Sequence, residues 1–82
     1  MFVRLENTNE HNKFYEMLGY AYVDNETNKD NSINLTIRYG IINCEGRTIF
    51  KQFKDRAELW DFVRRKTDEK LRKGYKIVKS RE

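Results

Sequence analysis

Two short strings in the chain alternate cations with aromatic rings: Lys13-Phe14-Tyr15 and Arg38-Tyr39. Such a cation can hold a phosphate by charge while a neighbouring ring lies against a sugar or a base. An aromatic residue in a strand more often packs in a core, and we favour that role for Phe14. Tyr39 ends its predicted strand, where a side chain can emerge as a contact. The strings therefore favour binding of a phosphate-bearing ligand.

Catalytic chemistry has little support in the sequence. There is one histidine, His11, in a polar turn, and one cysteine, Cys44, so neither a structural zinc site nor an internal disulfide can be assembled. No glycine-rich phosphate loop or nucleophile elbow is present. We therefore expect a protein that is not an enzyme and that holds no metal or cofactor.

The elements that would position these residues can be read from hydrophobic alternation. The clearest strand is Ile33–Tyr39, in which apolar and polar residues alternate without a break, so that its odd-numbered residues share one face. The nine polar residues at 24–32 form a predicted loop, and 41–46 form a predicted connection. We predict four antiparallel strands in all, at Phe2–Glu6, Lys13–Val23, Ile33–Tyr39 and Arg47–Phe53.

One helix is predicted at about Asp55–Lys73. Asp55 and Glu58 have the spacing of a capping box, and Gly74 supplies the residue that commonly ends a helix. A broad apolar arc is expected to pack on the sheet, formed by Leu59, Trp60, Phe62, Val63 and Leu71. Residues 74–82 are interpreted as a basic tail.

The 82 residues are enough for one domain, at 1–82, with a thin core. The predicted fold class is α+β, a small antiparallel sheet of about four strands packed by one C-terminal helix. No apolar run approaches the ~20 residues of a membrane span. We expect a cytoplasmic protein, or a nuclear one in a eukaryote.

Charge is distributed unevenly along the chain. The net charge is +4, but the segment from Arg64 to the end has nine basic and three acidic residues. Such a segment attracts phosphates or an acidic partner, although a solvated helix face is the alternative reading.

In their order, several strings resemble those of the WGR domain, a module of DNA-damage-dependent poly(ADP-ribose) polymerases. The strings cover nearly the whole sequence: Asn12-Lys13-Phe14-Tyr15, Arg38-Tyr39-Gly40-Ile41, Gly46-Arg47, Phe53 and Arg72-Lys73-Gly74-Tyr75. The resemblance implies a reader of DNA ends in which the motif's Trp packs on a terminal sugar and its Arg holds the backbone. It also implies phosphate contacts from an Asn-Lys pair.

Carried over by position, Asn12 and Lys13 are intact, Tyr39 stands for the Trp and Ile41 stands for the Arg. An aliphatic side chain cannot donate hydrogen bonds to phosphate. Arg38 or Arg47 can replace the missing cation, although strand alternation can also point Arg38 to the face opposite Tyr39.

The sequence thus predicts a non-enzymatic, stand-alone WGR-like domain that binds nucleic acid, with DNA ends or distorted DNA as the expected ligand. The predicted contact residues are Asn12, Lys13, Arg38, Tyr39 and Arg47. The alternative is a protein-protein interaction adaptor or inhibitor that has lost DNA binding. The choice between DNA and RNA, and the oligomeric state, stay open.

Overall fold

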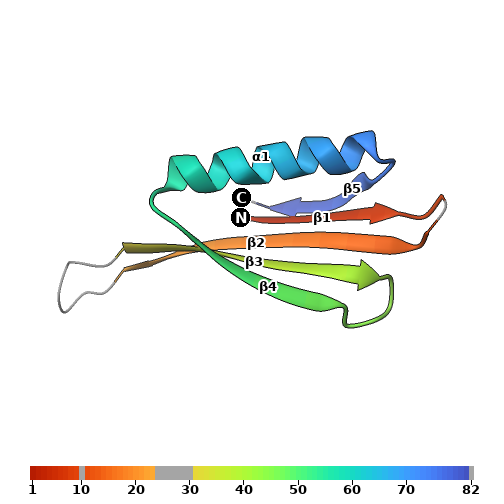
Figure 1. Cartoon of the computed structure of the whole chain (residues 1–82), viewed down its shortest axis with the longest axis horizontal. Coiled ribbons are helices and arrows are strands. Elements are labelled where there is room, and N and C mark those ends of the chain that lie inside the picture. The colour runs from red at the N-terminus through yellow and green to blue at the C-terminus, as the bar shows by residue number, and fades with distance from the viewer. Residues whose placement is uncertain (10, 24–30, 82) are drawn as a thin grey trace.

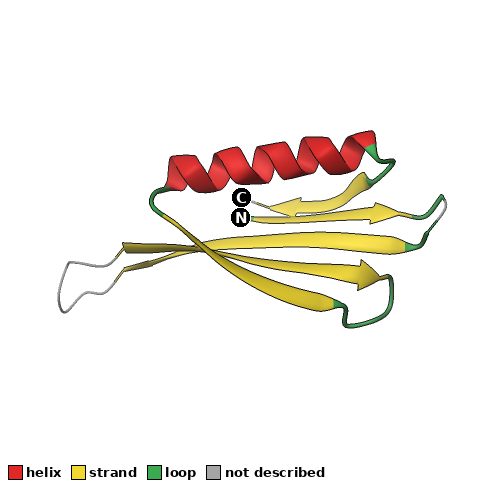
Figure 2. Ribbon diagram, in the orientation of Figure 1, coloured by secondary structure: helices red, strands yellow, loops and turns green. Residues whose placement is uncertain are grey.

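The fold is an antiparallel sheet with a single helix along one of its faces (Figure 1 and Figure 2). A computed structural model describes residues 1–9, 11–23 and 31–81. In chain order the elements are β1 (Phe2–Asn7), β2 (Lys13–Val23), β3 (Asn31–Ile41), β4 (Arg47–Phe53), α1 (Arg56–Arg72) and β5 (Lys76–Arg81). Their order across the sheet is β4-β3-β2-β1-β5, so β4 and β5 form the two edges.

Strand alternation gives the sheet two different faces. On the face that α1 covers, odd-numbered residues of the three central strands form the core with two helix residues: Leu5, Tyr15, Met17, Ile33, Leu35, Ile37, Leu59 and Val63. The even-numbered residues of β1 to β4 whose side chains the structure describes lie on the other face, which we call the open face. The predicted alternation of Ile33, Leu35 and Ile37 is confirmed, since all three are buried in this core.

The helix begins and ends as its sequence predicts. The Asp55 carboxylate accepts a hydrogen bond from the Glu58 backbone N–H at 2.8 Å, and Glu58 in turn accepts one from the Lys54 N–H at 3.3 Å. Gly74 has φ +96°, a left-handed conformation that glycine adopts at low cost. The side-chain amide of Asn7, a buried residue, donates to the Lys73 carbonyl at 3.2 Å and fastens the helix end to β1.

The structure corrects the predicted strands in three places. Residues 74–82 were expected to be a tail, but Lys76–Arg81 form β5, which pairs with β1. The β-branched residues Ile77 and Val78 favour a strand. The edge of β1 that faces away from β2 supplies the backbone groups with which this strand pairs. The third strand also runs past its predicted end at Tyr39, through Gly40 to Ile41, because both residues pair with β2. The predicted loop at 24–32 falls mainly outside the described residues, and Asn31 and Ser32 belong to β3.

The apolar arc predicted for the helix is narrower than expected. Leu59 and Val63 are buried and Phe62 packs at the edge of the core, but Trp60 is 48% exposed and Leu71 is 43% exposed. A broad arc of bulky residues was predicted to pack as one face, but a helix lying on a sheet buries a narrower stripe. The expectation that the whole arc is buried against the sheet is therefore wrong for Trp60 and Leu71, which are about half exposed.

Candidate functional site

The register of the sheet brings most of the predicted contact residues to one place. Tyr39 lies opposite Tyr15 on β2 and opposite Arg47 on β4, and Lys13 lies opposite Ile41. Residues directly opposite in antiparallel strands share a face, and the face here is the one that α1 covers. Lys13, Tyr39 and Arg47 therefore gather on the helix side of the sheet, where β2 begins and β3 ends.

Asn12 borders this group through its backbone. It has φ +46°, a conformation that asparagine adopts more readily than most residues, and its carbonyl accepts a hydrogen bond from the Ile42 N–H at 2.8 Å. The turn before β2 is thereby joined to the segment after β3. Ile41 is 58% exposed on the same face as Lys13.

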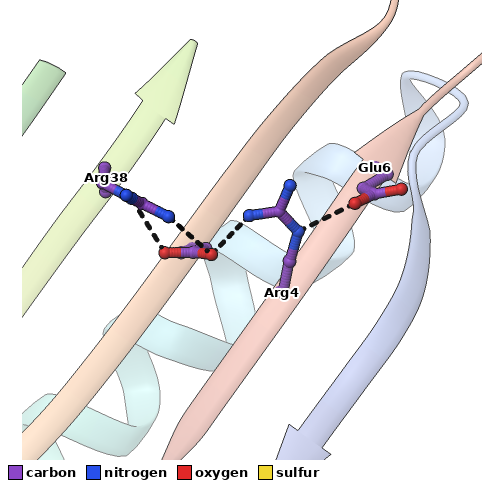
Figure 3. A network of polar contacts seen from close by, with 4 residues as sticks. Arg4, Glu6 and Arg38 are labelled. Carbon is purple, nitrogen blue, oxygen red and sulfur yellow. Dashed lines mark hydrogen bonds and ion pairs between the residues drawn. The ribbon is translucent and has the colours of Figure 1, made fainter. Parts of the chain in front are cut away.

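Arg38 lies on the open face, away from this group. It is paired in register with Glu16, and its Nε and Nη2 donate to the two Glu16 carboxylate oxygens at 3.1 Å each. Arg4 also donates to Glu16, and to Glu6 at 2.8 Å (Figure 3). Burial raises the pKa of the Glu16 carboxyl, but hydrogen bonds from Arg38 and Arg4 outweigh it and hold that pKa below its usual value. The sequence left the direction of Arg38 open; the structure separates it from Tyr39.

The open-face network also covers an aromatic side chain. Phe14 is 1% exposed, and the guanidinium carbons of Arg4 and Arg38 lie 4.5 Å and 5.1 Å from its ring centre. The predicted core role of Phe14 is confirmed, although the ring is buried on the face opposite the main core. A Cβ on Gly46 would lie 3.0 Å from this ring, so the segment between β3 and β4 packs closely against it.

Beside Tyr39, a groove of about 350 Å³ runs between α1 and the strands β3 and β4. We call it the Tyr39 groove. Its lining residues are Tyr15, Ile37, Tyr39, Ile49, Lys51, Phe62, Lys66 and Lys70. The rings of Tyr39 and Tyr15 are stacked, with centres 6.2 Å apart and planes inclined by 29°. Tyr39 is half-buried, so part of its ring is supported by Tyr15 while the rest faces solvent.

Lysines of the helix gather at the end of this groove. Lys70 lies 4.7 Å from the Tyr15 ring centre and also lines a second hollow with Lys13 and Lys73. Glu69 forms ion pairs with Lys66 at 3.0 Å and with Lys73 at 3.2 Å. Burial lowers the pKa of Lys70 because it disfavours the charged form, and the neighbouring positive charge of Lys73 lowers this pKa further. An anion placed here would relieve that repulsion.

The phenol of Tyr15 forms the floor of this site. Burial, followed by the nearby charge of Glu69 and the Tyr39 phenol, raises the pKa of Tyr15 to about 12. A tyrosine is neutral near pH 7 even at its ordinary pKa, so this phenol adds no negative charge to the groove.

Lys66 and Lys70 were not among the predicted contact residues. The sequence indicates only a basic C-terminal segment, whereas these two lysines line the groove from one side of α1. Their spacing of four residues places them on the same helix face, but it does not show that this face borders Tyr39.

Within the described residues, no group of three or more His, Cys, Asp or Glu side chains is placed to hold a metal ion. In the same part of the chain, no helix has the length and apolar character needed to cross a membrane. Cys44 is exposed and has a free thiol.

The comparisons with known proteins gave one match. The family model described as the WGR domain matches residues 1–82. No match was found among the curated proteins or among the solved structures.

Proposed function

Because the chain belongs to the WGR domain family, which is known for nucleic-acid binding, we propose that it binds DNA at ends or distortions through the face that carries Tyr39. One observation carries the proposal: a half-exposed ring lies beside a cluster of cations on the same face of the sheet. Such a ring can pack on a terminal sugar or base while the cations hold the flanking phosphates.

The roles follow from position. Tyr39 is the packing surface, supported from beneath by Tyr15. Lys70 supplies positive charge in the groove, and Lys13 supplies it in the second hollow, which Lys70 also lines. Arg47 supplies positive charge opposite Tyr39 in the register. Asn12 adds an exposed amide next to Lys13.

Arg38 has a different role in this proposal. Its guanidinium is engaged by Glu16 and covers Phe14, and Phe14 in turn packs against the Gly46 segment. We therefore assign Arg38 to positioning: it supports the strand end that carries Tyr39 without touching the ligand.

The test is fluorescence anisotropy with a labelled, 5′-phosphorylated short duplex, at low and at physiological salt, with an end-blocked hairpin as competitor. The proposal expects salt-sensitive binding that the hairpin competes for poorly. Lys13→Ala and Lys70→Ala should each reduce the slope of log affinity against log salt by about 0.9, because each removes about one phosphate contact.

Lys79→Ala is the matched control, because it removes the same charge from β5, where Lys79 lies opposite Arg4. It should change the slope less than either groove variant. Equal effects of all three variants would show that binding follows net charge and would reject the site. No binding at low salt would reject DNA as the ligand.

The second candidate function is that of a protein-interaction adaptor, and exposed apolar side chains favour it. Ile41 is 58% exposed beside Lys13, at the position where the family's motif has an Arg. An apolar contact at this place would bind a protein with little dependence on salt. Weak DNA binding together with nuclease-resistant, salt-insensitive capture of one protein would favour this candidate.

A further inference from the structure

The two edges of the sheet differ in how they discourage pairing with another strand. β5 has a register shift opposite Arg4 and Leu5, and it carries Lys76, Lys79 and Arg81. Bulges and charges on an edge strand are common devices against edge-to-edge association. β4 pairs with β3 without a register shift over Arg47–Phe53, and only Arg47 and Lys51 are charged in it. The β4 edge therefore presents a regular ladder of free backbone groups.

Apolar side chains are exposed on both faces of this edge strand. Ile49 is 41% exposed on the helix side, and Phe50 is 74% exposed on the open face. A partner lying against one face of the sheet would cover only one of these two side chains. A strand added to the β4 edge would flank both and would also pair the free backbone groups.

We propose that β4 pairs with β4 of a second copy of this chain, antiparallel and about a twofold axis at Phe50. In this register Phe50 faces Phe50, Ile49 faces Lys51, and Arg47 faces Phe53, so that no like charges are opposed. A twofold axis at Lys51 would place two lysines opposite each other, and an axis at Ile49 would oppose Lys51 to Arg47. Like charges directly opposite destabilise a strand pair, which argues against axes at Lys51 and Ile49. An axis at Thr48 or Gln52 would pair only three residues of β4 in each chain, whereas the axis at Phe50 pairs all seven, and this selects the register at Phe50.

The self-complementarity of the strand is the reason for choosing a second copy over another protein. In the selected register each cation of β4 meets an apolar side chain of its partner, and Arg47 meets an aromatic ring that can accept a cation. The number of copies is limited by the other edge of the sheet, because the charged and irregular β5 does not offer a second pairing site. The assembly closes as a twofold dimer and does not extend into a fibre.

Pairing at this edge also changes the Tyr39 groove. Ile49 and Lys51 line the groove from β4, and the partner's Ile49 would lie opposite Lys51 on the same face. Each copy thereby contributes an apolar side chain to the rim of the other copy's groove. Both grooves then lie on one side of a sheet that is continuous through the two copies.

The contact is confined to one strand and its side chains. It is therefore smaller than the ~800 Å² per partner of a standard protein interface. We expect a dimer that dissociates on dilution, and the measurements should span a wide range of protein concentration.

The first experiment is sedimentation equilibrium of the whole chain without nucleic acid, so that its outcome is separate from the proposed function. The apparent mass should rise with concentration from 10.0 kDa toward twice that value. Phe50→Lys should hold it at the monomer value. Leu18→Lys, which changes a 45% exposed apolar residue of β2, is the control and should leave association intact.

Cysteine cross-linking then tests the register, in a Cys44→Ser background. Two Phe50→Cys chains would face each other about 5 Å apart between Cα atoms, within disulfide range. Two Thr48→Cys chains would be offset by about 14 Å and should not cross-link. A mixture of Thr48→Cys with Gln52→Cys should form the mixed disulfide.

A monomer at every concentration, or association unaffected by Phe50→Lys, would overturn the proposal and leave the β4 edge for a strand of another protein. Cross-linking of Thr48→Cys chains to the same extent as Phe50→Cys chains would also overturn it, because it would reject the register.

Discussion

Arg38 and Tyr39 are neighbours in the sequence but lie on opposite faces of β3. The register shows the separation, because Arg38 is opposite Glu16 and Tyr39 is opposite Tyr15. Arg38 forms ion pairs on the open face, and Tyr39 stacks on Tyr15 beside the groove. The two residues therefore contribute to different properties of the protein, which separate substitutions can distinguish.

Replacing Tyr39 tests the packing surface. Stacking of a base on an aromatic side chain contributes ~1–3 kcal/mol by alanine substitution, so Tyr39→Ala should weaken duplex-end binding about tenfold. Tyr39→Trp should bind at least as tightly as the unchanged chain, since indole has a larger face. Anisotropy with the phosphorylated duplex measures both. Tyr20→Ala removes a ring that is 48% exposed elsewhere and should not change the affinity; an equal loss there would argue against a specific role for Tyr39.

Ile41→Arg should strengthen binding. Ile41 is exposed on the same face as Tyr39 and Lys13, so an arginine side chain can extend into solvent without displacing the core. A hydrogen bond to a charged group contributes about 1.5–3 kcal/mol, and a gain of about tenfold or more in affinity for the duplex is expected. Ile41→Gln is the neutral control of similar length. Unchanged affinity of Ile41→Arg would show that the DNA backbone does not approach this position.

Glu16→Gln should remove part of the pH dependence of stability. The pKa of Glu16 is lowered in the folded protein, so its contribution is fully present above the ordinary value of 4.5 and is lost as the pH falls through the folded-state pKa. The unchanged chain should lose stability in that acid range, and Glu16→Gln should lose less.

At neutral pH, Glu16→Gln should lower the free energy of unfolding by about 1–2 kcal/mol. The loss is modest because solvent partly screens the charge of Arg38. Urea unfolding at a series of pH values measures both effects. Asp68→Asn, on the exposed helix surface, is the control. If the free energy of unfolding of Glu16→Gln fell with decreasing pH as steeply as that of the unchanged chain, Glu16 would not be the source of the acid sensitivity.

Gly46→Ala should be more damaging than Gly74→Ala. Both glycines have positive φ, at +73° and +96°, and a left-handed conformation costs an L-residue roughly 1–2 kcal/mol. At Gly46 a Cβ would also lie 2.3 Å from the Tyr39 carbonyl oxygen, whereas at Gly74 the nearest atom is 3.5 Å away. Chemical unfolding should show the larger loss for Gly46→Ala. Equal losses would mean that the segment before β4 can move away from Tyr39.

Much of the fold could be predicted from local pattern. The strands at Lys13–Val23 and Arg47–Phe53 have the predicted bounds, and α1 begins after its predicted cap. Lys13–Val23 is rich in aromatic residues, which favour strands, and α1 has a capping signal at Asp55 within its own residues. Lys76–Arg81 has only a short apolar pair among cations, and it is a strand because β1, far away in the sequence, offers an edge.

The candidate site was less accessible to sequence reasoning. Alternation alone suggested that Arg38 and Tyr39 could diverge, but the pairing with Glu16 was needed to decide it. The groove depends on how α1 lies across the sheet, which brings Lys66 and Lys70 beside Tyr39. Contacts between elements distant in the chain are not encoded in any one segment, so these lysines were missed.

The pairing of β1 with β5 determines where the chain enters and leaves the fold. Phe2 lies directly opposite Arg81, and the two ends of the chain are side by side in Figure 1. Lys13 pairs with Asn7, at the other end of β1. If the domain were inserted into a loop of a host protein, the two junctions would be adjacent and the host would lose little loop-closure entropy. The Lys13 end would then point away from the host, free to approach a ligand.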